Sequence, residues 1–159
     1  MILKFLKIFS QNVCKNRLLT DTLLENYKNF NVLFIQEPSW SIIQNILSSM
    51  SEEEEEIIDA SNHPLWTIFP RISNIKNEHS RVLIYINIRL IRLCFSLQRD
   101  IFNHKDINLL FLFNHSIMCF LVNIYSDDHQ FTLKYLKSTE MNLNNILIMT
   151  RDFNIRNNN

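Results

Sequence analysis

The sequence predicts an α/β domain in which two β-sheets pack together and helices cover them. Two observations support this prediction. Short apolar, β-prone runs outnumber the segments with helical spacing, and several of these runs are close enough to form consecutive hairpins. In addition, 47% of the 159 residues are hydrophobic and 20% are charged, an ordinary balance for one domain with a substantial core. We therefore expect one domain over residues 1–155 and a disordered tail over residues 156–159.

The first third of the chain has the pattern of a strand, a helix and a second strand. The first run is apolar and β-prone, and the last is a short continuous apolar run, as in a strand buried on both faces. The middle run repeats leucines and aromatic residues at helical spacing. Pro38 lacks the N–H group of a ladder bond and ends the second strand. The predicted bounds are Leu3–Val13 for the first strand, Arg17–Asn29 for the helix and Asn31–Ile35 for the second strand.

The segment Ser48–Asn62 carries the weakest structural signal. It contains five consecutive glutamates, Glu52–Glu56. Because adjacent like charges repel, this run is most simply a solvated loop or the start of a helix. An acidic metal-binding run is the alternative.

The rest of the chain predicts further strands and a second helix. Ile107–Tyr125 has no formally charged residue and is long enough to span a membrane, but the polar triplet at 114–116 is costly in hydrocarbon. A hairpin of two buried strands is therefore preferred, and a membrane span is the alternative. Capping-box spacing begins the helix at Asp127. The predicted strands are Trp66–Pro70, Arg81–Ile88, Arg92–Gln98, Ile107–Phe113, Ile117–Tyr125 and Asn145–Thr150, and the helix runs towards Asn142.

Composition narrows the classes of function. The formal net charge is zero, whereas dedicated nucleic-acid binders usually have a basic excess, so charge gives no support to a DNA partner. The three cysteines are isolated, which fits buried thiols in a reducing compartment, and the histidines lack metal-ligand spacing. Glycine is absent, so tight turns are expected to rely on Asn, Asp or Ser. A compositionally biased genome and drift without selection both remain explanations for this absence.

Polar residues that suit phosphate chemistry lie where the predicted strands end. Carboxylates such as Glu37 and Asp152 are the hard oxygen ligands that Mg²⁺ needs, and strand ends at one rim of a sandwich can converge. Amide side chains can orient a phosphate or a water, and a tyrosine hydroxyl can donate to a phosphate oxygen. The alternative is that these residues only form turns. The candidates are Asn12, Glu37, Tyr125, Asp152 and Asn154.

The order and surroundings of these residues resemble a known family. Ser10–Val13 resembles the opening motif of the endonuclease/exonuclease/phosphatase superfamily, which includes deoxyribonuclease I. Phe34–Trp40 resembles its second motif in the form favoured by retroelement endonucleases, particularly fungal ones. Asn123–Ser126 resembles the third motif and Asp152–Asn154 the fourth, while His63–Trp66 is similar to the same branch. The resemblance to the endonuclease domain of non-LTR retrotransposons covers nearly the whole chain.

This resemblance implies a four-layered α/β sandwich and a phosphodiesterase that depends on Mg²⁺ or Mn²⁺. By carry-over, Glu37 holds the metal with Asn12 beside it, and Tyr125 contacts the scissile phosphate. Asp152 orients or activates the attacking water, and Asn154 helps to place the phosphate. The implied partner is DNA, nicked in the nucleus so that reverse transcription can start, with no membrane. A reverse transcriptase domain in the full-length element is a further implied partner.

Two departures from the family pattern bear on activity. The family has glycine before the Asp-Phe-Asn triplet, and this chain has Arg151. Family members also continue to a Ser-Asp-His motif that supplies the general base, which this sequence lacks. We therefore expect a C-terminally truncated domain that does not nick DNA alone. Three hypotheses stay open: a metal-dependent endonuclease, a catalytically inactive retroelement fragment that keeps the fold, and, less well supported, a small-molecule phosphatase.

Overall fold

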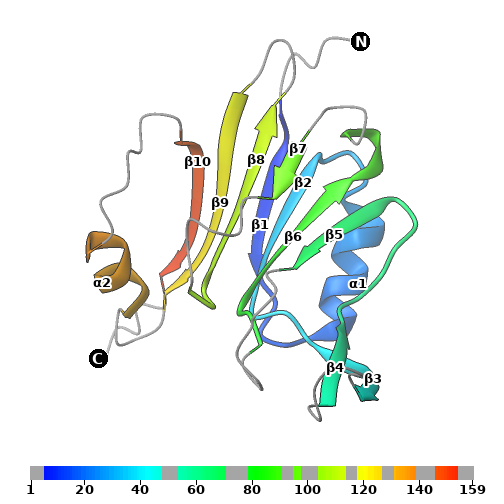
Figure 1. The fold of residues 1–159 in the computed structure, drawn as a ribbon. Coiled ribbons are helices and arrows are strands. Elements are labelled where there is room, and N and C mark those ends of the chain that lie inside the picture. Colours follow the sequence, from blue (N-terminus) through cyan, green and yellow to red (C-terminus); the bar gives the residue numbers. More distant parts are fainter. Residues whose placement is uncertain are drawn as a thin grey trace, which may run out of the picture.

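Two four-stranded sheets are present in the described parts of the chain (Figure 1). The computed structural model describes residues 6–47, 54–70, 79–90, 95–97, 104–113, 118–126, 131–138 and 146–153. The first sheet has the strand order β1 (Ile8–Asn12), β2 (Val32–Gln36), β6 (Val82–Asn87), β5 (Trp66–Pro70). The second has the order β10 (Ile146–Phe153), β9 (Met118–Ser126), β8 (Ile107–Phe113), β7 (Phe95–Leu97). The remaining elements are the ribbon of β3 (Ser41–Leu47) and β4 (Glu54–Asp59), the helices α1 (Arg17–Asn26) and α2 (Phe131–Ser138), and the short helix η1 (Ile88–Leu90).

Each sheet contains a parallel pair and antiparallel pairs. In the first sheet β1 and β2 are parallel, and β6 runs antiparallel to both β2 and β5. In the second sheet β9 and β10 are parallel, and β8 runs antiparallel to both β7 and β9. Figure 1 shows the C-terminal ends of β1, β9 and β10 at the same end of the molecule. The topology therefore brings chain segments that are distant in sequence to one rim.

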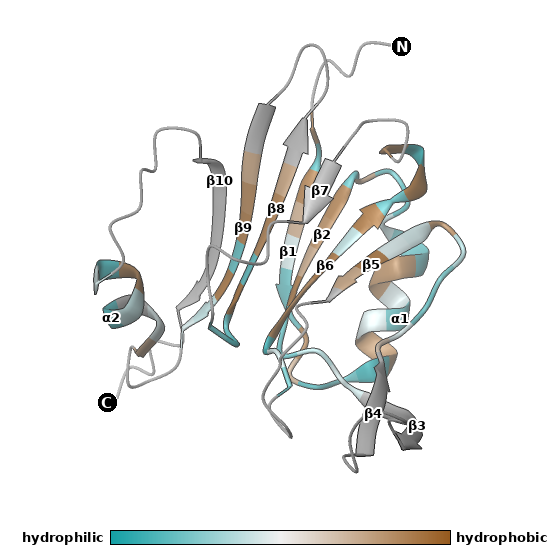
Figure 2. Ribbon diagram, in the orientation of Figure 1, coloured by the Kyte–Doolittle hydropathy of each residue, from teal (hydrophilic) through white to brown (hydrophobic). Residues whose placement is uncertain are grey.

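Alternating side chains divide the hydrophobic core into layers. Val32 and Phe34 of β2 pack towards the second sheet, where they meet Leu110 and Leu121 in one buried cluster. Leu33 and Ile35 of β2 pack on the opposite face of the sheet. The apolar bands of the two sheets are visible in Figure 2. Full burial of one such side chain contributes about 1.5–3 kcal/mol, so the contact between the sheets stabilises the fold strongly.

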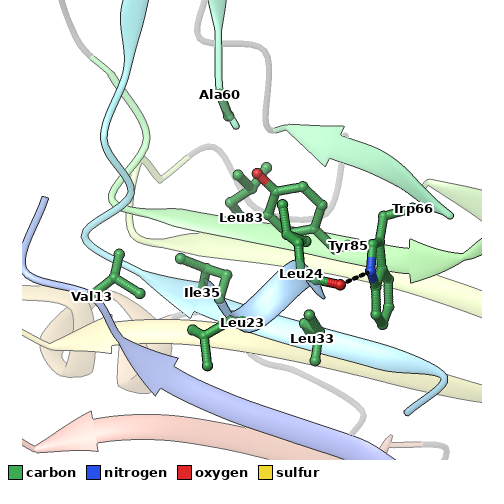
Figure 3. Packing of buried hydrophobic residues seen from close by; sticks show 9 residues of the cluster. All are labelled: Val13, Leu23, Leu24, Leu33, Ile35, Ala60, Trp66, Leu83 and Tyr85. Carbon is green, nitrogen blue, oxygen red and sulfur yellow. Dashed lines mark hydrogen bonds between the residues drawn. The ribbon is translucent and has the colours of Figure 1, made fainter. Parts of the chain in front are cut away.

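Helix α1 covers the outer face of the first sheet. Asn16 caps its N-terminus, because the Asn16 side chain accepts a hydrogen bond from the N–H of Leu19 at 3.0 Å. Leu23 and Leu24 pack into the cluster drawn in Figure 3. There the Trp66 indole N–H donates to the carbonyl of Leu24 at 2.9 Å and ties β5 to the helix.

Helix α2 covers the outer face of the second sheet. Tyr135 and Leu136 pack against a third buried cluster, which contains Val122 and Ile124 of β9. The layers are thus α1, first sheet, second sheet and α2, which confirms the α/β sandwich predicted from the sequence. The β8–β9 pairing confirms the hairpin interpretation of Ile107–Tyr125. None of the described helices is long and apolar enough to cross a membrane.

Several sequence predictions need correction or fall outside the described residues. Glu54–Glu56 lie in β4, paired with β3, instead of in a loop or helix start, and β3 was not predicted. Pairing with a neighbouring strand outweighs the repulsion that a local charge count suggests. Strand β10 runs to Phe153, so Asp152 lies inside the strand and not after its end. The expected helix start at Asp127 and the expected tail at 156–159 lie outside the described residues.

The glycine-free turns differ from the expectation. Among the described residues, the positive φ angles belong to Cys14 (48°), Lys15 (59°) and Glu37 (48°), not to Asn, Asp or Ser. A non-glycine residue in this region costs of order 1–3 kcal/mol, which the surrounding structure must offset. Cys14 is exposed, so the prediction of buried thiols is wrong for this residue.

Candidate functional site

The site centres on a hydrogen bond between the two sheets. Glu37 follows β2 directly, and Tyr125 is the penultimate residue of β9. The Tyr125 hydroxyl donates to Oε1 of Glu37 at 2.9 Å. Tyr125 is buried and Glu37 is partly buried, so the carboxylate lies at the boundary between core and solvent.

The backbone holds Glu37 in an unusual conformation. Its N–H donates to the carbonyl of Arg81 at 2.8 Å, and its carbonyl accepts from the N–H of Lys15 at 2.7 Å. These contacts join the residue to the start of β6 and to the turn after β1, and they maintain its φ of 48°. Strained conformations that neighbours impose occur preferentially at functional sites. The strain at Glu37 therefore favours a role beyond turn formation.

Asn12 lies beside this carboxylate in the sheet. It ends β1 and pairs in register with Gln36, the residue before Glu37. Its side-chain oxygen accepts a hydrogen bond from the N–H of Cys14 at 2.8 Å and stabilises the tight turn that leads to Lys15. The same turn donates to the Glu37 carbonyl, so Asn12 helps to shape the site.

The two residues predicted from the fourth motif are placed less completely. The parallel pairing of β9 with β10 makes Asp152 the register partner of Tyr125, and Arg151 the partner of Ile124. The backbone of Asp152 is thus next to the tyrosine that binds Glu37. The side chain of Asp152 and all of Asn154 lie outside the described residues. Their roles, like those of the other candidates, stay predictions.

An ion pair that the sequence analysis did not identify supports the tyrosine. The guanidinium of Arg81 lies over the Tyr125 ring, 4.4 Å from its centroid. Its Nε donates to Oδ1 of Asp106 at 2.6 Å and its Nη2 to Oδ2 at 2.5 Å. Asp106 is buried and also accepts from the Thr132 hydroxyl of α2 at 3.2 Å. The two charged residues stand at the starts of predicted strands, but nothing in their spacing indicates that they pair.

The buried amide of Asn123, two residues before Tyr125, joins the two sheets by hydrogen bonds. Nδ2 of Asn123 donates across the layers to the carbonyls of Ile35 at 3.1 Å and Leu83 at 3.0 Å. Its Oδ1 accepts from Nε2 of Gln36 at 2.8 Å. The motif resemblance singled out the Asn123–Ser126 segment, but not this structural role of its first residue. The network fixes β9 against β2 and therefore fixes Tyr125 relative to Glu37.

The described side chains supply a single carboxylate at the centre of the site. No group of three or more His, Cys, Asp or Glu residues that could hold a metal is found in the part of the chain that the structure describes. His63 contacts Glu25 at 2.9 Å, and His104 lies 3.7 Å from Asp106. His63 and His104 thus lie beside carboxylates other than Glu37.

Comparisons with known proteins agree with this architecture at the level of the fold. No family model matches the sequence, and no curated protein matches it. Among solved structures, the chain is similar to the endonuclease domain of TRAS1, a telomere-specific non-LTR retrotransposon. The TM-score is 0.57 and the sequence identity 13%, and the match covers 82% of this chain and 49% of that structure. The chain therefore spans about half the length of a distantly similar endonuclease domain.

Proposed function

We propose that this chain carries part of a metal-dependent phosphodiesterase site that acts on DNA. The observation that carries the proposal is the contact of the Tyr125 hydroxyl with the Glu37 carboxylate. The contact joins two sheets at the residues that the motif resemblance selects. The structural similarity to a retrotransposon endonuclease domain supports a nuclease-like function, and hence a DNA substrate, in broad terms.

The residues present fit a magnesium or manganese ion. Mg²⁺ commonly binds through one or two carboxylates, keeps several waters, and is completed by substrate phosphates. Glu37 offers one carboxylate at the edge of the core, and its Oε1 already has a hydrogen-bond donor that fixes its orientation. When bound, the ion would polarise the phosphoryl group and neutralise developing negative charge. We assign this binding to Glu37, with Asn12 beside it.

The remaining residues would act on the phosphate and the water. The Tyr125 hydroxyl can turn from Glu37 to donate to a phosphate oxygen when the substrate is present. Asp152, whose backbone is paired with that of Tyr125, would orient the attacking water. Asn154 would help to place the phosphate. In a full-length element, a reverse transcriptase domain would extend the nicked strand.

Metal binding is the first test. Mn²⁺, followed by electron paramagnetic resonance, should bind the native chain and should bind Glu37→Gln much more weakly. Glu25→Gln is the matched control, because Glu25 is an exposed carboxylate on α1 that contacts Lys28 and His63 instead of the site. Equal Mn²⁺ binding by the native chain and Glu37→Gln would contradict the proposal.

Cleavage is the second test, and it separates this proposal from its alternative. Supercoiled plasmid is incubated with each protein and Mg²⁺ or Mn²⁺, with Glu37→Gln purified in parallel to expose contaminating nucleases. Metal-dependent nicking that Glu37→Gln loses supports the phosphodiesterase. A folded chain that binds Mn²⁺ and does not nick supports the alternative, a catalytically inactive protein that keeps the fold. Arg151, next to Asp152 in β10, is the observation that favours this alternative.

A further inference from the structure

The ion pair between Arg81 and Asp106 is built more rigidly than a surface contact. Asp106 is buried, with 1% of its side chain exposed, whereas 28% of the Arg81 side chain is exposed. Two parallel N–H···O bonds hold the guanidinium in one plane. The central carbon of the guanidinium lies over the Tyr125 ring, 4.4 Å from its centroid.

We infer that Arg81 and Asp106 are positioning residues that hold the Tyr125 hydroxyl on Glu37. This inference rests on the proposed function, because holding the hydroxyl on Glu37 matters for function only if Glu37 is a metal ligand. It adds the residue before β6 and the residue before β8 to a site that motif resemblance confines to strand ends. Through Thr132, it also makes α2 part of the support for the site.

The physical argument concerns the freedom of the tyrosine ring. A hydroxyl at the tip of a long ring swings widely when the ring turns about its side-chain bonds. A guanidinium over one face is attracted to the ring quadrupole and blocks this motion on that side. The arginine can do so only if it is fixed itself, which the bidentate bond to a buried carboxylate achieves. The N–H of Tyr125 also donates to the carbonyl of Asp106 at 2.9 Å, so the same residue anchors the ring support and the tyrosine backbone.

A purely structural ion pair would leave a different signature. It would contribute to stability, but the coupling between Tyr125 and Glu37 would not depend on it. The two possibilities are therefore separated by measuring that coupling with and without the ion pair.

The experiment is a double-mutant cycle in two backgrounds. Tyr125→Phe, Glu37→Met and their combination are compared in urea unfolding, and the non-additivity of their midpoint shifts reports the hydrogen bond, because methionine has no oxygen to accept it. The cycle is repeated in Arg81→Met/Asp106→Leu, which removes both charges. Removing only Arg81 would leave a buried carboxylate without its guanidinium partner and threaten folding, whereas replacing both partners is often tolerated. Arg89→Met, an exposed arginine just after β6, is the matched control background.

The expected result is non-additivity in the native and Arg89→Met backgrounds, and its loss in Arg81→Met/Asp106→Leu. Undiminished non-additivity in the last background overturns the inference. This readout needs neither metal nor turnover, so it stands even if the proposed function fails the Mn²⁺ test.

Mn²⁺ affinity gives a second readout. Mutation of a residue that orients a metal ligand typically lowers the affinity for the metal by about 10–100-fold. Arg81→Met/Asp106→Leu should therefore weaken Mn²⁺ binding about 10-fold or more, and the loss should vanish when Tyr125 is already phenylalanine. An equal loss in the Tyr125→Phe background would show that the ion pair does not act through the tyrosine.

Discussion

Replacing Asn123 with leucine should destabilise the chain by about 3 kcal/mol. The substitution keeps the approximate size of the side chain and removes three hydrogen bonds across the layers, those to Ile35, Leu83 and Gln36. Each such bond contributes about 1 kcal/mol net. For a chain of this size, 1 kcal/mol corresponds to about 2–4 °C in Tm, so the expected fall is about 6–12 °C.

Asn108→Leu is the matched comparison. Asn108 is the register partner of Asn123 in the same sheet, is similarly buried, and makes one bond of this kind, to the carbonyl of Phe69 at 2.7 Å. Because both substitutions place leucine between the sheets, the gain from burying its apolar surface is similar in each and largely cancels. Thermal unfolding followed by circular dichroism should show a fall in Tm that is about three times larger for Asn123→Leu than for Asn108→Leu. Equal falls, or a smaller one for Asn123→Leu, would refute the hydrogen-bond reasoning.

Further predictions concern the turn after β1, the indole bond and the surface of α1. Lys15→Gly should raise Tm by about 1–4 °C, because glycine removes the cost of a positive φ and loses only part of that gain to unfolded-state entropy. Lys15→Ala keeps the cost of the positive φ and should not raise Tm. Calorimetry measures the Tm of both variants. Trp66→Phe removes the bond to the Leu24 carbonyl and should lower stability by about 1–3 kcal/mol in urea unfolding. Hydrogen bonds from Lys28 and then His63 lower the pKa of Glu25. Because the pKa of Glu25 is lower in the folded state, its carboxylate stabilises the fold above the unfolded pKa, and this stabilisation is lost as pH falls through the folded pKa. The difference in Tm between the native chain and Glu25→Gln should therefore shrink in acid, and a constant difference would contradict this.

The sequence could predict buried strands because a continuous apolar run is a local pattern. The run Asn31–Ile35 indicates a strand buried on both faces, and β2 is buried throughout. The motif residues Glu37 and Tyr125 could be selected because they stand at strand ends in a family-like order. Their contact at 2.9 Å then followed from the topology.

Other features depend on partners that are distant in sequence. Arg81 and Asp106 look like ordinary charged residues beside strands, and only the fold brings them together, with the Arg81 guanidinium over the Tyr125 ring. The strand at Glu54–Asp59 is decided by its pairing with β3, which a local charge count does not include. The positive φ of Glu37 arises from hydrogen bonds to Arg81 and Lys15, not from the preference of glutamate.

The hydrogen bond between Tyr125 and Glu37 also constrains how the chain folds. It joins residues 88 positions apart, and the Asn123–Gln36 bond joins residues 87 apart. For a loop of 88 residues, the logarithmic part of the closure entropy alone is about 4 kcal/mol. Such distant pairings form slowly, after local contacts have lowered the entropy of the chain. The first sheet can form before β9 joins it, so the carboxylate and the tyrosine should meet only when the sheets dock, late in folding.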